Sequence, residues 1–287
     1  MPAEPPAIDV RAVTKRFAQG ALPALDKVSL HVSEGEIHGV LGLSGAGKTT
    51  LLRCIARLEL PDSGKILISG SDWTSLTAAE LRSERGKMGI LFQQLHLLSS
   101  RTVSANISLP LELSGTPRAA IAPRVMELLD WFGILDKAKD YPSQLSGGQR
   151  QRVALARALA SNPRVLLADE PASALDAETR ASVLNTLRSI REQFGVTIPI
   201  ITHDLHSAAT ICDMITVLDA GRVAESGQRG RYLSLRRPGL HNGSWRVRLR
   251  LKAEPRRFIE RTSRRSASHE QPAGTRPRFE RSKSACS

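Results

Sequence analysis

The chain contains Gly42-Leu43-Ser44-Gly45-Ala46-Gly47-Lys48-Thr49, a run that fits the pattern G-x-x-x-x-G-K-[ST] at every fixed position. Glycines in this pattern let the backbone curl so that successive N–H groups point inward at a phosphate, and the following helix adds its positive N-terminal end. The Lys48 ammonium can reach the β- and γ-phosphates of a nucleotide, and the Thr49 hydroxyl can bind Mg²⁺. Taken alone, the run predicts that a phosphate is held between a strand at residues 36–41 and a helix at residues 48–58.

A second run, Leu145-Ser146-Gly147-Gly148-Gln149, lies further along the chain. It resembles the signature of ATP-binding-cassette (ABC) ATPases, and the two runs in this order are typical of that superfamily. The resemblance implies an α/β fold of the P-loop NTPase, ABC type, with a parallel core sheet, an antiparallel β subdomain and an inserted helical subdomain. It also implies an ATPase that uses ATP and Mg²⁺.

The positive charge of the chain is concentrated at one end. The 287 residues carry a net charge of +13. Residues 227–287 contain 17 Lys and Arg, four Glu and no Asp, so residues 1–226 are balanced with 24 basic and 24 acidic side chains. A nucleic-acid partner is therefore not indicated for the main part of the chain, whatever the overall charge suggests.

Other compositional features favour a cytosolic protein. No apolar run approaches the ~18 residues that a membrane-spanning helix needs, and the N-terminus lacks the pattern of a secretory signal. Cys54, Cys212 and Cys286 are far apart and show no metal-binding or redox spacing. Cys54 and Cys212 fall in segments that the pattern predicts to be buried helix, where cysteine acts as a small hydrophobic residue.

Strands and helices alternate over residues 8–226, which we expect to form the ATPase domain. Expected strands cover residues 8–17, 27–32, 36–41, 65–69, 87–93, 164–168, 197–202 and 214–218, and expected helices cover residues 48–58, 149–160 and 177–193. The helical subdomain is expected at about residues 95–160. Its candidate buried side chains are Met126, Leu128, Leu129 and Phe132.

An apolar strand ends in Asp169 and Glu170, which resembles a Walker B element. The resemblance implies that Asp169 holds Mg²⁺ and that Glu170 aligns and deprotonates the attacking water. Gln93 follows a strand at the position of the family's Q-loop glutamine, with Gln94 as the neighbouring alternative. His203 ends another strand and matches the H-loop histidine, and Ser173-Ala174-Leu175-Asp176 resembles the D-loop.

The resemblance implies the following site. The catalytic residues are Glu170, His203 and Gln93; the metal-binding residues are Thr49, Gln93 and Asp169; the nucleotide-binding residues are Phe17, Gly42, Ser44, Gly45, Ala46, Gly47, Lys48, Thr49, Thr50, Ser146, Gly147, Gly148 and Gln149. Phe17 matches the aromatic residue that stacks on adenine, although a core phenylalanine would look identical. The signature residues open a second helix whose N-terminus favours anions. In the family this helix faces the ATP of a second chain, so the resemblance implies a homodimer.

Two further strings resemble the ATPase subunit of bacterial methionine importers: Leu97-Leu98-Ser99-Ser100-Arg101-Thr102-Val103 and Leu109-Pro110-Leu111-Glu112-Leu113. The resemblance implies a peripheral subunit on the cytoplasmic face of the bacterial inner membrane that powers uptake of an amino acid, methionine above all. Its partners would be integral-membrane permease subunits and, indirectly, a substrate-binding protein. The alternatives are an ATPase of another transport, lipoprotein-release or cell-division complex, or a truncated, non-productive cassette. Repair and translation ATPases are disfavoured because the chain has neither a long coiled coil nor a second cassette.

The sequence departs from that family in two places. Pro199 interrupts the strand before His203, where proline removes a ladder donor. Residues 227–287 do not resemble the regulatory domain that usually follows, and they are too poor in apolar residues to form a core, so we expect a disordered basic tail. Within it, residues 245–252 alternate apolar and basic side chains, which is the period of a half-buried strand. The tail is either a truncated or frame-altered end, which we favour, or a segment that grips anionic lipid or RNA.

Overall fold

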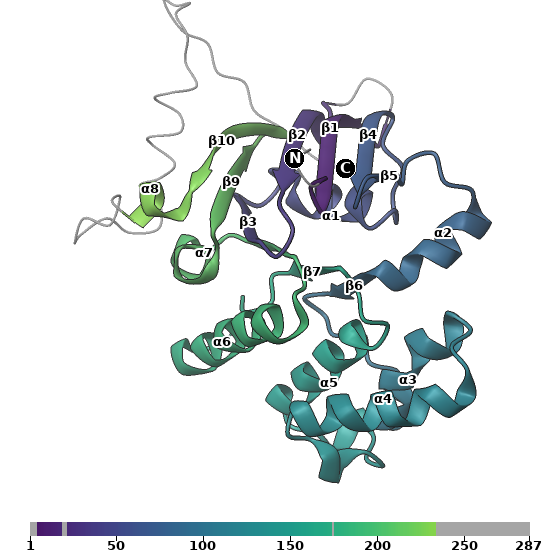
Figure 1. The fold of residues 1–287 in the computed structure, drawn as a ribbon. Coiled ribbons are helices and arrows are strands. Elements are labelled where there is room, and N and C mark those ends of the chain that lie inside the picture. Colours follow the sequence, from purple (N-terminus) through teal and green to yellow (C-terminus); the bar gives the residue numbers. More distant parts are fainter. Residues whose placement is uncertain (1–4, 19–21, 174, 234–287) are drawn as a thin grey trace, which may run out of the picture. The chain divides into compact units, whose positions relative to one another are not determined.

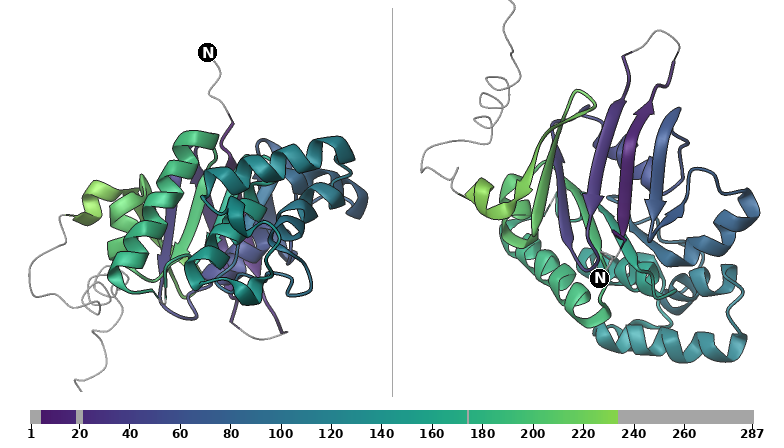
Figure 2. Two further views of the ribbon diagram at one scale, coloured as in Figure 1. Left: turned by 90° about the horizontal axis from the view of Figure 1, so that it is seen from below. Right: turned by 45° about the horizontal axis from the view of Figure 1, so that its top comes forward.

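The computed structural model describes residues 5–18, 22–173 and 175–233, and these residues belong to one compact unit. Two sheets organise this part of the chain (Figures 1 and 2). The first is antiparallel, in the order β2-β1-β4-β5. Its strands are β1 (Ile8–Lys15), β2 (Leu25–Val32), β4 (Ser63–Ile68) and β5 (Ser71–Asp72). The predicted strand at residues 245–252 and Cys286 lie outside the described residues.

The second sheet has the order β10-β9-β3-β8-β7-β6 and is parallel except for β10 at its edge. Its strands are β3 (Ile37–Gly42), β6 (Met88–Leu91), β7 (Val165–Asp169), β8 (Ile198–Thr202), β9 (Met214–Asp219) and β10 (Arg222–Gln228). Strands β3 and β8 are buried along their whole length, as expected of parallel strands covered on both faces. The β10 strand crosses the expected domain boundary at residue 226.

Helices connect and cover these strands. The described part of the chain contains α1 (Lys48–Ile55), α2 (Ala78–Glu84), α3 (Val103–Leu113), α4 (Arg118–Trp131), α5 (Gly147–Leu159), α6 (Ala177–Phe194), α7 (Leu205–Ile211) and α8 (Arg229–Leu233), with short 3₁₀ turns at Arg85–Lys87, Leu135–Lys137 and Pro142–Gln144. Helix α1 contacts β3, β7 and β8, so the end of the phosphate-binding loop rests on the core sheet. Helices α3, α4 and α5 pack on one another, and α5 also packs against β6. The expected fold class is confirmed.

One face of α4 supplies the core of the helical part. Val125, Leu128 and Leu129 are buried, and Phe132 follows them at 5% exposure. These positions are spaced i, i+3, i+4 and i+7, which places them on one side of a helix. The prediction is confirmed for Leu128, Leu129 and Phe132 but is wrong for Met126, which is 48% exposed. Met126 lies about 100° around the helix from Val125, so it faces solvent.

The two described cysteines behave as apolar core residues. Cys54 is buried in α1 as expected, whereas Cys212 is buried at the residue that ends α7. Burial raises the pKa of the Cys54 thiol to about 11, and burial likewise raises the pKa of the Cys212 thiol. Both thiols therefore stay protonated and unreactive at neutral pH.

Pro199 lies inside β8, which is sandwiched between β3 and β7. Its neighbour Ile198 donates its N–H to Glu36 on the β3 side, so the nitrogen of Pro199 faces β7. The β7–β8 ladder is interrupted there: Thr197 pairs with Val165, and pairing resumes only at Ile200 and Ala168. The sheet thus accommodates the proline by losing one rung, as expected from the missing N–H, and β8 continues to Thr202, the residue before His203.

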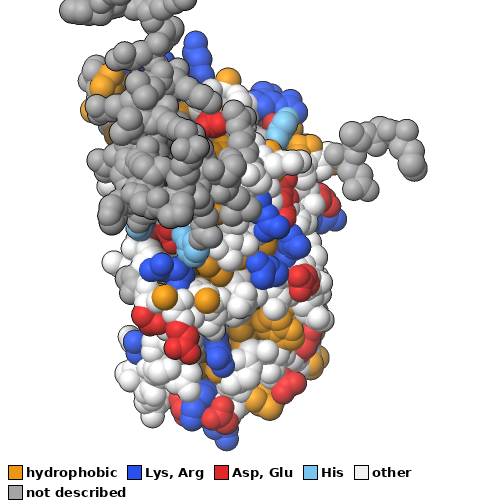
Figure 3. Space-filling view, turned by 90° about the vertical axis from the view of Figure 1, so that its left-hand side faces the viewer, with side chains coloured by type: hydrophobic (Ala, Val, Ile, Leu, Met, Phe, Trp, Pro, Cys, Tyr) orange, Lys and Arg blue, Asp and Glu red, His pale blue; other side chains and the backbone are white. Residues whose placement is uncertain are grey.

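The surface of the described residues carries both signs of charge. Figure 3 shows Lys and Arg side chains interspersed with Asp and Glu on the face seen there, in agreement with the charge balance of residues 1–226. Among the described residues, none of the helices combines the length and the apolar character that a membrane crossing requires.

Candidate active site

Glycines shape the loop between β3 and α1. Gly47, the residue just before α1, has φ +98°, and a Cβ placed on it would lie 2.4 Å from the carbonyl oxygen of Ala24. A Cβ on Gly42 would lie 2.6 Å from the carbonyl oxygen of Leu218. Gly45 also has positive φ, at +80°. Larger residues would clash at Gly47 and Gly42 and would be strained at Gly45. The predicted tight loop is therefore present, and it needs glycine at these three positions.

The Lys48 side chain curls back over this loop. Its Nζ donates hydrogen bonds to the carbonyl oxygens of Gly42 and Leu43, both at 2.9 Å. Burial lowers the pKa of Lys48, and the negative charges of Glu170 and Asp169 counteract part of that effect. The ammonium is therefore held at the mouth of the loop, close enough to the acidic end of β7 to interact with both carboxylates. Thr49 is exposed and Thr50 half-buried in the first turn of α1.

Two adjacent carboxylates end β7. Burial raises the pKa of Asp169, and the neighbouring charge of Glu170 adds to the rise, while Lys48 and Arg53 oppose it. Glu170 takes a left-handed backbone conformation with φ +50°, which is uncommon for a residue with a side chain. Its N–H donates to the carbonyl oxygen of Ile201 at 2.8 Å, so the turn after β7 is tied to β8. This bond directs the Glu170 side chain toward the end of β8, where His203 follows.

The predicted catalytic residues lie together. His203 Nδ1 is 2.9 Å from Oε1 and 2.8 Å from Oε2 of Glu170. Gln93, just beyond β6, donates from Nε2 to the Ser173 hydroxyl at 3.3 Å, and that hydroxyl donates to the Glu170 carbonyl oxygen at 3.2 Å. Ser173 thus joins the loop after β6 to the loop after β7. Gln93, Glu170 and His203 come from three neighbouring strands of one sheet and meet at the carboxyl ends of those strands.

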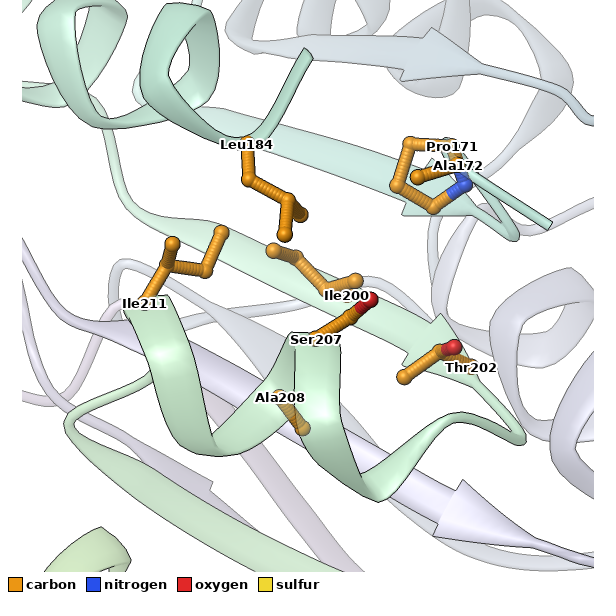
Figure 4. A pocket seen from close by; sticks show the side chains of 8 residues that line it. All are labelled: Pro171, Ala172, Leu184, Ile200, Thr202, Ser207, Ala208 and Ile211. Atoms are coloured by element: carbon orange, nitrogen blue, oxygen red, sulfur yellow. The ribbon is translucent and has the colours of Figure 1, made fainter. Parts of the chain in front are cut away.

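Apolar packing supports the loops that carry Glu170 and His203. Pro171 and Ala172, which follow Glu170, face Ile200 of β8 and Ala208 of α7 around a cavity of about 10 Å³ (Figure 4). Because this volume holds no more than about one water molecule, the cavity is a packing gap and not a ligand site. Both loops are therefore anchored on a nearly close-packed apolar layer.

The signature residues form the N-terminus of α5. The Ser146 hydroxyl accepts the N–H of Gln149 at 3.2 Å, and Gln149 Oε1 accepts the N–H of Ser146 at 2.9 Å, which is a complete capping box. Gly147 and Gly148 are exposed. Among the described residues, no hydrogen bond or ion pair joins these four residues to the phosphate loop. Within the described part of the chain, hydrogen bonds and charges thus connect Gln93, Glu170, His203 and Lys48, and no such contact connects them to the signature residues.

Two side chains of α5 bind the neighbouring loops. Gln151 donates from Nε2 to the carbonyl oxygen of Pro171 at 2.9 Å. Arg157 donates to the carbonyl oxygens of Leu95 at 2.6 Å and His96 at 2.7 Å. The signature helix is in this way bonded both to the turn after Glu170 and to the segment after Gln93.

Phe17 lies past the end of β1, in contrast to the predicted strand that included it. Its side chain is 62% exposed, so it is not a core residue. Lys15, two residues before Phe17, accepts the Ala24 N–H on its carbonyl oxygen at 2.8 Å, and Ala24 abuts Gly47 of the phosphate loop. The exposed ring is thus carried by a segment that borders the loop.

Sequence reasoning missed Arg180, which lies on α6. Its Nη2 donates to the carbonyl oxygen of Leu175 at 2.9 Å, and its Nη1 lies 3.7 Å from Asp204 Oδ2. Arg180 therefore connects the loop after Glu170 to the residue after His203. A charged residue in the first turn of a helix with one buried face gives no signal of such a role, because both partners of Arg180 are fixed only by the tertiary structure.

Comparison with known proteins identifies the family of this chain. A family model described as "ABC transporter" matches residues 25–173, which include the phosphate loop, the signature and the end of β7. The chain belongs to the ABC transporter family. It is 49% identical over 222 residues to methionine import ATP-binding protein MetN 1 of Bacillus licheniformis, and 52% identical over 223 residues to MetN of Myxococcus xanthus. Each match covers 77% of this chain and, respectively, 67% and 68% of the relative.

Solved structures agree with this membership. The dimeric, post-hydrolysis structure of the ATP-binding cassette MJ0796 with ADP and Pi superposes with a TM-score of 0.69 at 34% identity, over 77% of this chain and 98% of that one. The cbiO1 protein of Clostridium perfringens, part of the cbiONQ transporter complex, gives 0.75 at 28% identity, over 86% and 96%. The chain is an ABC ATPase with an ATP-binding domain, a class whose members dimerise and join transporter complexes with membrane components. A match to MetN of Desulfitobacterium hafniense is 53% identical over 204 residues and covers 71% of this chain and 60% of that relative.

Proposed function

We propose that this chain is the ATP-hydrolysing subunit of an importer that takes up an amino acid, namely methionine. The similarity of about half of the matched residues to methionine import ATP-binding proteins supports the substrate, because relatives with that name occur in several bacterial groups. The partners would be a second copy of the chain, integral-membrane permease subunits and, through them, a substrate-binding protein. The chain would then work at the cytoplasmic face of the bacterial inner membrane.

The observation that carries the ATPase mechanism is the meeting of Lys48, Asp169 and Glu170. The γ-phosphate of ATP would take the Lys48 ammonium from the two loop carbonyls that now accept its hydrogen bonds. Glu170 would accept a proton from the attacking water as the water oxygen bonds to the γ-phosphorus and the bond to the bridging oxygen breaks, giving ADP and phosphate. His203 would contact the γ-phosphate while it holds the Glu170 carboxylate, and Gln93 would touch the metal or the water.

The residues present fit a magnesium ion. Asp169 and Thr49 offer the oxygen ligands that this hard cation prefers. Burial and the charge of Glu170 raise the pKa of Asp169, and the positive charges of Lys48 and Arg53 offset this rise only in part, so a cation would stabilise the acidic end of β7 further. Bound there with ATP, the ion would neutralise charge on the phosphates.

The remaining assignments concern the nucleotide-binding residues. Phe17 would stack on adenine, the residues from Gly42 to Thr50 would hold the phosphates, and Ser146, Gly147, Gly148 and Gln149 would reach the ATP of the partner chain.

We further propose that residues 8–226 with the continuation to Leu233 form the catalytic unit. Tyr232 of α8 is buried and its hydroxyl donates to the carbonyl oxygen of Ile215, so a truncation should keep residues up to 233. Removal of residues 234–287 is then expected to leave ATPase activity intact.

The test is ATP hydrolysis by the complex with a candidate permease, co-expressed and purified, with and without a methionine-loaded binding protein. Glu170→Gln is the inactive control. Stimulation by the loaded binding protein supports methionine import. Hydrolysis that ignores the solute contradicts the substrate and favours another transport complex. Failure to assemble or hydrolyse in the full chain contradicts a productive cassette.

A further inference from the structure

The segment that carries Phe17 follows β1 and is held by residues that do not belong to β1. Strand β1 changes register twice against β2 and once against β4, and Ala12 has a left-handed φ of +48° at the irregularity. Gly64 lies so close that a Cβ on it would stand 2.5 Å from the Ala12 carbonyl oxygen. Such a bulge bends a strand and re-aims the residues beyond it. The direction of Phe17 therefore depends on what holds the chain after Thr14.

Asp62 holds that segment at two points. Its N–H donates to the carbonyl oxygen of Thr14 at 2.8 Å, and its Oδ2 accepts the N–H of Arg16 at 2.6 Å. The next residue, Ser63, is the first of β4 and pairs with Thr14. The ladder between β1 and β4 ends at the pair Thr14 and Ser63. Beyond that pair, the Asp62 carboxylate accepts the Arg16 N–H in place of a backbone carbonyl oxygen, so it adds one hydrogen bond past the end of the ladder. Arg16 is the residue immediately before Phe17.

The Lys15 side chain bonds the same segment to the connection between α1 and β4. Its Nζ donates to the carbonyl oxygen of Leu60 at 2.8 Å and lies 3.6 Å from Glu59 and 3.7 Å from Asp62. The same ammonium stands over the Phe17 ring, 5.5 Å from its centroid. The residues from Glu59 to Asp62 belong to the connection from α1 to β4. Because α1 opens from the phosphate loop, this connection relates the ring to the phosphate site.

We infer that Asp62 is a positioning residue that aims Phe17 at the adenine ring, so that selection for a purine base over a bare polyphosphate depends on the connection between α1 and β4. The inference rests on the proposed role of Phe17 in stacking. Without the Asp62 carboxylate the Arg16 N–H turns to water, the turn samples more directions, and the ring offers a less ordered platform. Affinity for the base falls, whereas the grip of the Lys48 loop on phosphate does not change.

The experiment compares Mg²⁺-ATP with Mg²⁺-tripolyphosphate, which has no base, in isothermal titration of the full chain. Asp62→Ala is expected to weaken ATP binding roughly three- to tenfold, the loss of one hydrogen bond to a charged acceptor at a half-exposed site. Tripolyphosphate binding should not change. Asp62→Asn keeps an acceptor oxygen and should bind ATP as the unaltered chain does. Glu59→Gln removes a neighbouring carboxylate 3.6 Å from Lys15 Nζ and should also bind both ligands normally, because Lys15 keeps its hydrogen bond to Leu60 and Asp62 keeps its hydrogen bond to the Arg16 N–H.

Phe17→Ala separates the inference from its premise. It should weaken ATP binding by about tenfold or more, from the loss of base stacking, and leave tripolyphosphate binding unchanged. If Phe17→Ala has no effect on the ratio of the two affinities, the stacking role itself is wrong. If Phe17→Ala shifts the ratio and Asp62→Ala does not, only the role of Asp62 is overturned. An equal loss for both ligands in Asp62→Ala, or an equal loss of ATP binding in Asp62→Asn, also overturns it.

Discussion

His203 Nδ1 lies within 2.9 Å of both carboxylate oxygens of Glu170, so one imidazole holds the group that we expect to deprotonate water. Replacing that carboxylate by an amide keeps the shape and removes the basic oxygen. Glu170→Gln is therefore expected to slow hydrolysis by ~10²–10⁴-fold and to leave ATP binding in place. With hydrolysis blocked, an ATP-bound dimer should accumulate and elute as such in size-exclusion chromatography with ATP and Mg²⁺. Elution of the variant as a monomer under these conditions would contradict the dimer mechanism.

Asp169→Asn should stabilise the protein while it harms the function. The pKa of Asp169 is raised in the folded chain, so folding disfavours its charged form, and this cost is fully present above the raised pKa. The cost disappears as the pH falls through the raised pKa toward the usual value of an aspartate. We expect the thermal midpoint of the variant, without nucleotide, to exceed that of the unaltered chain by on the order of a few degrees at pH 7.5. The gap should shrink in acid.

The same variant should lose a ligand effect. Stabilisation by ATP that depends on Mg²⁺ should vanish, since a bound ligand stabilises only the state that binds it. Differential scanning calorimetry at two pH values, with and without Mg²⁺ and ATP, measures both quantities. A lower midpoint for Asp169→Asn in the absence of ligand would show that the carboxylate is stabilising and that the direction of its pKa shift is wrong.

Arg180 connects the loop after Glu170 to the residue after His203, so we expect Arg180→Ala to misplace the catalytic pair without touching the phosphate loop. The steady-state kcat should fall by roughly three- to tenfold, the range for one lost hydrogen bond, while the Kd for ATP stays the same. Arg188→Ala is the matched control: Arg188 lies on the same helix and donates to the carbonyl oxygen of Thr210, away from the site. Equal loss of activity in both variants would mean that α6 is merely destabilised.

The core strands and the convergence of Gln93, Glu170 and His203 could be predicted because each strand is an apolar run that ends in a polar motif. The carboxyl ends of parallel strands meet at one edge of a sheet, so Gln93, Glu170 and His203 had to converge once the strands were placed. Strand β10 was not predicted, because its residues alternate between exposed and half-buried and its sequence begins the change to the basic tail. Helix α2 was also missed, although Thr77 and Glu80 form a capping box. It buries no side chain and therefore lacks apolar periodicity.

Contacts made by polar side chains with backbone carbonyls account for most of what the sequence could not predict. Arg157 with Leu95, Arg180 with Leu175 and Lys15 with Leu60 join residues whose approach depends on the finished packing. A carbonyl oxygen is present at every residue, so the sequence carries no information about which one will be bonded. The resemblance supplied the residues of the site but not the groups that aim them.

Pro199→Val should stabilise the protein, because it restores the missing rung between β8 and β7. Thr197 donates to the carbonyl oxygen of Arg164, so in the same register residue 199 would donate to that of Leu166, which is buried in β7. An unsatisfied buried acceptor costs about 1–3 kcal/mol. Losing the rigidity that proline gives the unfolded chain costs about 0.4–1 kcal/mol. The first effect is larger, so the free energy of unfolding in urea should rise by about 1 kcal/mol. The new amide should exchange its hydrogen slowly, and ATPase activity should not change. A decrease in stability would show that the sheet has adapted its packing to the proline ring and that the interrupted ladder costs it nothing.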